Sequence, residues 1–229
     1  MNHQHRSRGF TLIEILVGVA ILAILSAALT PLVVKYINDG RRARALSDSQ
    51  EIGQAIIAFN LDVGNWPVND DANPNDRGEL SRLVGLPAAQ ISAAAIPGGQ
   101  GAPGAGNWNG GGAGGRAGAL EDQLIRNQRG AVAPLYPPSP RAPEPAGWNG
   151  PYLKSVPLDP WGRPFVCNVR YLTSANVRGV TVAESNNHAV FCLSAGPDGV
   201  FNTSFSDATQ LQAPGGDDIG WPIQNDNTP

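Results

Sequence analysis

Residues 10–34 form an apolar run that constrains the fold of this chain more than any other feature. Nineteen of these 25 residues are apolar, and Glu14 is the only charged one. As a helix rising 1.5 Å per residue, the run would be roughly 37 Å long, which is enough to cross a bilayer. A cleaved secretory signal has a shorter apolar core followed by a small-residue cleavage site. We therefore expect a retained single transmembrane helix.

The charges around this run pose two problems. Two arginines precede it and four basic residues follow within ten positions, so a count of positive charges would place the C-terminal side in the cytoplasm. A carboxylate within a membrane helix costs about 2.5–3.5 kcal/mol near the bilayer centre and less near an end. Glu14 is therefore expected either to lie at the membrane edge or to have a partner.

The stretch RGFTLIE, residues 8–14, resembles the processing motif of type IV prepilins and pseudopilins. In that family a membrane peptidase cuts after the Gly of a short basic leader and methylates the new N-terminal Phe. The resemblance implies that Gly9 ends a cleaved leader and that Phe10 is the methylated N-terminus. It further implies that Glu14 and Pro31 are the family's assembly residues, with Glu14 neutralising the Phe10 amine of a neighbouring subunit. It also implies a cytoplasmic leader, with the remainder outside the inner membrane, against the charge count.

Composition argues against several other functions. The net charge is −3, so no basic excess points to nucleic acid. The chain has three His and two Cys, which disfavours His-based zinc clusters and most Ser/His/Asp or Cys/His catalysis. Gly and Pro number 28 and 20 and concentrate in residues 97–118 and 134–151, which indicates a globular chain with loop-rich insertions. We expect residues 97–118 to form a mobile surface loop.

The hydrophobic pattern predicts a two-layer α+β domain. An amphipathic stripe continues the first helix to about Asp62, and Pro31 should kink or locally unwind that helix. The stripe consists of Ala45, Ser49, Ile52, Ile56, Phe59 and Val63. Short helices are expected at 78–84 and 119–126, and strands at 164–172, 177–183 and 189–193. Short links between these strands favour an antiparallel meander covering the stripe.

Three later segments resemble the major pseudopilin of type II secretion systems. They are GPYLKSVPLDPWG at 150–162, LSAGPDG at 193–199 and DDI at 217–219. The resemblance implies a pilin fold, with a long N-terminal helix packed on a small antiparallel sheet, long loops and a C-terminal calcium loop. Its expected domains are a leader at 1–9, a membrane and assembly helix at 10–34, and a periplasmic domain at 35–229. The resemblance does not cover the Gly/Pro-rich insertion at 92–147.

The same resemblance implies one bound Ca²⁺. Asp198, Asp217 and Asp218 match the family's ligand positions, and hard cations prefer such oxygen ligands. Ser194 and the Leu193 carbonyl are weaker candidates, and Asp207 could join them. Seventeen residues separate Gly199 from Asp217, where the family has only a few. The alternative is a plain Pro-Asp-Gly turn and a solvated acidic pair.

Cys167 and Cys192 allow two interpretations. Both fall in predicted strands of one sheet in an oxidising compartment, which favours a disulfide. Their positions in the alternating pattern of each strand do not obviously match, and two buried free thiols are the alternative. Bridging requires Cα atoms less than about 7 Å apart.

Three functions remain open at this point. The first is a structural subunit of a periplasmic pseudopilus, a homopolymer that drives export of folded proteins and depends on prepilin peptidase, other pseudopilins and inner-membrane assembly proteins. Before assembly such a subunit would lie in membrane lipid as a single-pass inner-membrane protein. The second is a type IV pilin or minor pilin-like subunit of an extracellular fibre. The third, a membrane-anchored periplasmic enzyme or calcium-binding module, needs a catalytic set that the sequence lacks.

Overall fold

The computed structural model describes most of the chain in eight stretches. They are residues 9–69, 80–99, 108–109, 116–128, 134–136, 147–172, 190–205 and 214–223. The chain divides into two compact units, Met1–Arg41 and Arg42–Pro229, and we describe each by itself. The predicted strand at 177–183 and Asp207 lie outside the described residues.

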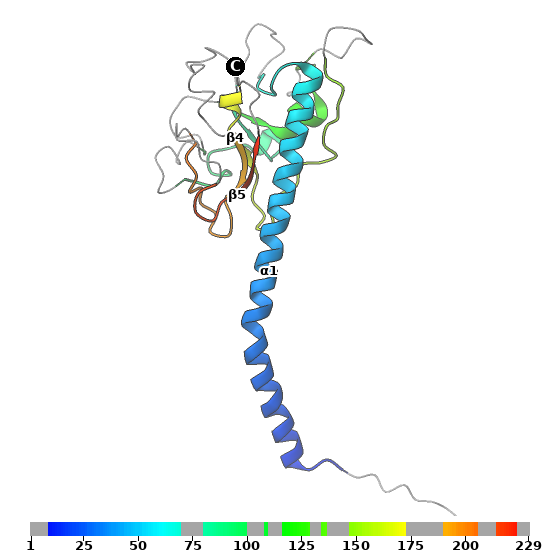
Figure 1. Ribbon diagram of the computed structural model, residues 1–229, viewed down its shortest axis with the longest axis vertical. Coiled ribbons are helices and arrows are strands. Elements are labelled where there is room, and N and C mark those ends of the chain that lie inside the picture. Colours follow the sequence, from blue (N-terminus) through cyan, green and yellow to red (C-terminus); the bar gives the residue numbers. More distant parts are fainter. Residues whose placement is uncertain are drawn as a thin grey trace, which may run out of the picture. The chain divides into compact units, whose positions relative to one another are not determined.

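The first helix, α1, extends over Leu12–Val63 (Figure 1), close to the predicted end at Asp62. Among the described residues it is the one helix long and apolar enough to cross a membrane. Pro31 lies inside α1 and the helix continues through it, so the expected local unwinding is absent. A single missing amide donor removes one bond from the helical ladder, and the neighbouring bonds suffice to keep the helix intact.

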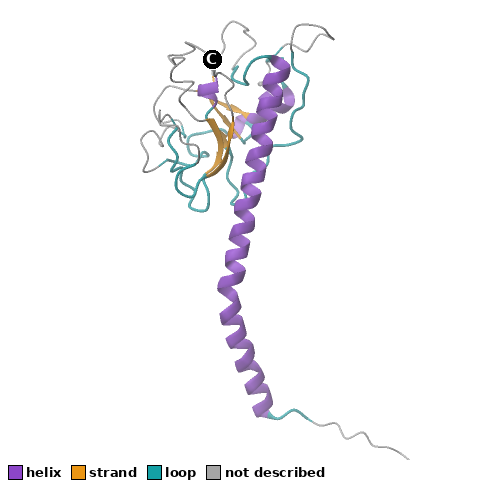
Figure 2. Ribbon diagram, viewed as in Figure 1, coloured by secondary structure: helices purple, strands orange, loops and turns teal. Residues whose placement is uncertain are grey.

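The second unit contains a five-stranded sheet with the order β2-β1-β3-β4-β5 (Figure 2). Its strands are β1 (Leu80–Val84), β2 (Arg116–Ala119), β3 (Val166–Cys167), β4 (Val190–Ser194) and β5 (Ile219–Ile223). The β1–β2 pair is parallel and the other pairs are antiparallel. The predicted α+β arrangement is confirmed, but the sheet is mixed, because the expected antiparallel pairing does not extend to the β1–β2 pair. A parallel pair needs a long crossover connection, and the Gly/Pro-rich insertion between β1 and β2 supplies that length.

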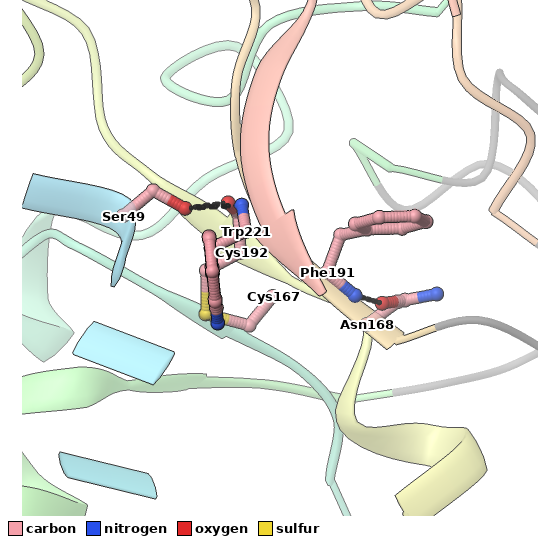
Figure 3. The surroundings of a disulfide bond; sticks show 6 residues. All are labelled: Ser49, Cys167, Asn168, Phe191, Cys192 and Trp221. Carbon is pink, nitrogen blue, oxygen red and sulfur yellow. Dashed lines mark hydrogen bonds between the residues drawn. A yellow bond between two sulfur atoms is a disulfide. The ribbon is translucent and has the colours of Figure 1, made fainter. Parts of the chain in front are cut away.

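Two local predictions were also wrong. The segment predicted as a helix at 78–84 contains β1, whose five residues are all buried in the sheet, so tertiary pairing overrides local preference. The strand predicted at 164–172 stops after Cys167 and is followed by the 3₁₀ helix η4 (Val169–Leu172). The reason is Asn168, whose side-chain oxygen accepts the Phe191 N–H at 2.8 Å in place of a backbone carbonyl (Figure 3).

Other predicted elements are present. β4 corresponds to the strand predicted at 189–193. The predicted helix at 119–126 is a turn of π-helix, η3 (Asp122–Arg126), and a further 3₁₀ turn, η1, covers Ala88–Gln90. All six residues of the predicted stripe on α1 are buried, and four of them, from Ile52 to Val63, belong to the hydrophobic core.

The Gly-rich segment 97–118 differs from the surface loop that we expected. Trp108, within that segment, is completely buried and belongs to the hydrophobic core. The end of the segment is the start of β2. Burying the large apolar indole is favourable, and the described part of the segment around Trp108 is packed into the domain.

Candidate functional site

The N-terminal motif is presented at the start of α1. Gly9 and Phe10 precede the helix, and Phe10 is 84% exposed. The Thr11 backbone N–H and hydroxyl each donate to Glu14 Oε2 at 2.8 Å, and the Glu14 N–H donates to Thr11 Oγ1 at 3.3 Å. This reciprocal arrangement is a capping box, which satisfies free N–H groups at a helix start. The Thr-x-x-Glu spacing is the sequence signal for this capping box.

The first unit exposes an apolar helix surface. Between Leu12 and Ile37 many large apolar side chains of α1 are about half exposed or more. A soluble monomer rarely exposes a contiguous apolar surface of this kind. An apolar surface of this kind can be covered by lipid or by another apolar helix.

The acidic loop between β4 and β5 brings two predicted ligands together. Asp217 Oδ2 accepts the Asp198 N–H at 3.3 Å, and Asp198 Oδ1 accepts the Val200 N–H at 2.8 Å. Gly196 has φ +61°, and a Cβ there would collide with the Asp217 carbonyl oxygen. Glycine is therefore required at this position both for its backbone conformation and for the close approach of Asp217.

Asp218 is held by one of its two carboxylate oxygens. Oδ2 accepts the Asn202 N–H at 2.9 Å, the Thr203 N–H at 2.7 Å and the Thr203 hydroxyl at 2.5 Å. Oδ1 is buried and has no hydrogen-bond partner among the described residues. Burial raises the pKa of Asp218 to about 6, although the bonds from Thr203 and Asn202 act in the opposite direction.

The two weaker candidates lie elsewhere. The Ser194 hydroxyl donates to Asp159 Oδ2 at 2.6 Å, and Leu193 lies in the sheet opposite Val166 and Gly220. Asp159 also accepts the backbone N–H groups that close its own turn. The Ser194 hydroxyl also accepts the Gly196 N–H at 3.2 Å, so Ser194 links the turn entering the sheet to the start of the acidic loop.

The acidic loop fits a hard cation in part. In the stretches that the structure describes, no three His, Cys, Asp or Glu side chains converge as a metal-binding group. The Asp198–Asp217 contact and the buried, unpartnered Oδ1 of Asp218 nevertheless supply carboxylate oxygens within one loop. Such donors suit Ca²⁺, which also accepts backbone carbonyls and water, and do not suit a soft metal. Arg163 donates to the Gly196 carbonyl at 2.7 Å, which places a positive charge beside the loop.

Cys167 and Cys192 form a disulfide across β3 and β4 (Figure 3). The two residues are direct partners in the antiparallel register, with their Cα atoms 4.0 Å apart. Direct pairing puts both side chains on one face of the sheet, which resolves the mismatch suggested by the alternating pattern of each strand.

Two family models match the chain. Residues 4–30 match the prokaryotic N-terminal methylation motif, and residues 131–208 match type II secretion system protein G. Both matches are to the families that the sequence resemblance implied. The second match includes β3, β4 and part of the acidic loop.

Several curated relatives bear the name type II secretion system core protein G. The protein from Aeromonas hydrophila is 23% identical over 71% of this chain and 73% of its own length. The one from Pseudomonas aeruginosa is 26% identical over the same shares. The one from Klebsiella pneumoniae is 30% identical over 40% of this chain and 61% of its own length. No solved structure matches the chain.

Proposed function

We propose that this chain is the major pseudopilin of a type II secretion system, a structural subunit that polymerises through α1 into a periplasmic fibre and drives the export of folded proteins. The observation that supports the proposal is that two family matches occur in one chain. An N-terminal methylation motif precedes an exposed apolar helix, and a protein G segment lies in the folded domain. That family is structural, and the chemistry proposed here is assembly rather than catalysis.

The proposed life cycle begins in the inner membrane. The apolar part of α1 anchors the subunit in lipid while prepilin peptidase removes residues 1–9 from the cytoplasmic side. The domain lies in the periplasm, where the Cys167–Cys192 disulfide would be stable. Removal from the membrane then requires the exposed apolar face of α1 to be covered by other subunits, because leaving it in water costs about 25 cal/mol per Å². Other pseudopilins and inner-membrane assembly proteins are the expected partners.

The experiment is complementation of a strain from which this gene has been deleted. Export of secreted proteins and the presence of fibres after overexpression are measured together. The proposal expects both to be lost in the deletion strain and restored by the wild-type gene. Normal export in the deletion strain, combined with gene-dependent fibres on the cell surface, would instead identify an extracellular pilin.

Ca²⁺ binding at the acidic loop is a second part of the proposal. The support is the unpartnered, buried Oδ1 of Asp218 together with the Asp198–Asp217 contact in the same loop. A ligand that binds only the folded state stabilises it by about 2.7 kcal/mol at one hundred times its Kd. Melting of the full chain in detergent with Ca²⁺ and with chelator tests this. Asp217→Ala should abolish the shift, whereas Asp39→Asn on the exposed surface of α1 should retain it. An unchanged wild-type midpoint would remove the site.

A further inference from the structure

Trp108 is buried in an aromatic cluster with two phenylalanines of the acidic loop. Its indole is completely buried, with ring centroids 4.9 Å from Phe201 and 5.0 Å from Phe205. The Phe201 N–H donates to the Gly98 carbonyl at 2.8 Å, so the start of the Gly-rich segment runs beside the same part of the loop. Two segments about one hundred positions apart in the sequence therefore pack as one unit.

The buried side chain of Arg82, on β1, also binds Trp108. Arg82 on β1 is 2% exposed and donates through Nη1 to the Trp108 carbonyl at 3.2 Å. Its guanidinium also lies 5.8 Å from the centre of the Phe205 ring. The position of Trp108 is thus determined by the sheet on one side and by the acidic loop on the other.

A continuous chain of hydrogen bonds leads from Trp108 to Asp218. The Trp108 indole N–H donates to the Thr203 carbonyl at 2.8 Å. Thr203 donates both its backbone N–H and its hydroxyl to Asp218 Oδ2, and its hydroxyl also accepts the Gly215 N–H at 2.9 Å. Thr203 is 1% exposed, so water cannot replace these bonds without local opening.

These hydrogen bonds determine which carboxylate oxygen of Asp218 remains available to bind a cation. Oδ2 accepts three hydrogen bonds and is fully used, whereas Oδ1 is buried without a partner among the described residues. A carboxylate held in this way cannot rotate to exchange its two oxygens without breaking all three bonds. It therefore presents a preoriented, desolvated oxygen, and preorientation lowers the cost of binding a cation.

We propose that Trp108 and Thr203 are positioning residues for Ca²⁺ at Asp218, so that cation binding and the packing of Trp108 are thermodynamically coupled. This inference rests on the proposed Ca²⁺ site. Coupling is reciprocal: if the packing of Trp108 strengthens Ca²⁺ binding, then Ca²⁺ must stabilise the packing of Trp108 by the same factor. Trp108 then supports the cation site although it lies far from the ligands in sequence.

The first test compares Ca²⁺ affinities of the full chain in detergent by titration calorimetry. Thr203→Val removes the hydroxyl bond to the carboxylate and should weaken binding about tenfold, because bonds to charged groups are the stronger ones. Thr203→Ser keeps the hydroxyl and should restore the affinity. Trp108→Phe keeps an aromatic ring, loses the N–H donor and should weaken binding about threefold.

The matched control is Trp148→Phe. Trp148 packs against Tyr152 with ring centroids 5.9 Å apart, and its indole N–H has no hydrogen-bond partner among the described residues. The same substitution there should leave Ca²⁺ affinity unchanged.

The second test measures the reverse direction of the coupling. Amide hydrogen exchange of peptides containing Trp108 should slow when Ca²⁺ is added to the wild type, and it should respond less in Thr203→Val. If the wild type binds Ca²⁺ and neither its Trp108 peptides nor the affinities of the Trp108 and Thr203 variants respond, the coupling is wrong while the Ca²⁺ site stands. If the wild type binds no Ca²⁺, both the site and the coupling are wrong.

Discussion

The Ser49 hydroxyl on α1 donates a 2.5 Å hydrogen bond to the carbonyl oxygen of Cys192 on β4. The same hydroxyl accepts the Trp221 N–H of β5 at 2.8 Å (Figure 3). Cys192 and Trp221 are partners in the β4–β5 register, so Ser49 joins the helix to the backbones of two adjacent strands. Ser49 is completely buried, and it is the polar member of an otherwise apolar stripe because these two backbone groups require a partner.

Ser49→Ala should destabilise the domain. The substitution removes the partner of the buried Cys192 carbonyl and of the partly buried Trp221 N–H, and an unsatisfied buried group costs about 1–3 kcal/mol. Denaturant unfolding of the full chain in detergent measures the loss. Ser47→Ala is the control, because Ser47 is exposed two positions earlier on the same helix and should change stability little. Equal stabilities of the two variants would contradict this role of Ser49.

Loss of the disulfide should also destabilise the domain. The bridged residues are 25 positions apart, and the chain-entropy model gives about 3–4 kcal/mol for closing such a loop in the unfolded chain. Replacing both cysteines by Ser should lower the melting temperature, and reductant should reproduce the effect in the wild type. Alkylation of both thiols in unreduced protein would show that the bridge is absent.

Processing should remove residues 1–9. Mass spectrometry of the protein isolated from membranes should find a chain that begins at Phe10 and carries one additional methyl group. Gly9→Val should retain the leader, because by family resemblance the peptidase needs a small residue before the cut. A wild-type protein that still begins with Met1 in the membrane would contradict both the motif and the proposed topology.

Two substitutions of Glu14 should separate its local role from its role in assembly. Glu14→Gln keeps an acceptor for the Thr11 capping box and removes the charge, whereas Glu14→Ala removes both. If Glu14 neutralises the Phe10 amine of a neighbouring subunit, both variants should lose fibres, since an unpaired buried charge costs about 3–5 kcal/mol.

Two quantities are measured: fibre yield, and disulfide formation in the exported domain. Disulfide formation should stay normal in both variants. Glu51→Ala, at an exposed position of α1, should assemble normally. Normal fibres from Glu14→Gln would assign only the capping role to Glu14.

Features that depend on residues close in sequence could be predicted, whereas features that depend on distant residues could not. The buried stripe from Ala45 to Val63 could be predicted because helical periodicity repeats within one element. The β1 strand could not, because its residues become a strand only by pairing with β2 and β3. The end of β3 was hidden for a similar reason, since Asn168 meets the Phe191 N–H from a distant part of the chain.

The candidate sites divide in the same way. The N-terminal motif could be recognised from the sequence, because Gly9, Phe10 and Glu14 lie within six consecutive residues. The acidic residues Asp198, Asp217 and Asp218 could be named from the sequence, but their different environments could not. Nothing in the local pattern around Trp108 or Thr203 indicates that they meet beside Asp218.

The sequence by itself determined a helix long and apolar enough to cross a membrane, the methylation motif at its start and the buried stripe, because each depends on residues within a few helical turns. Only the tertiary structure decided the parallel β1–β2 pair, the direct pairing of Cys167 with Cys192, and the oxygen of Asp218 that is left without a partner. These features depend on groups brought together across 15 to 36 positions of the chain. Burial favours a hydrogen-bond partner for most polar atoms, and the packing of the domain decides which atoms find one.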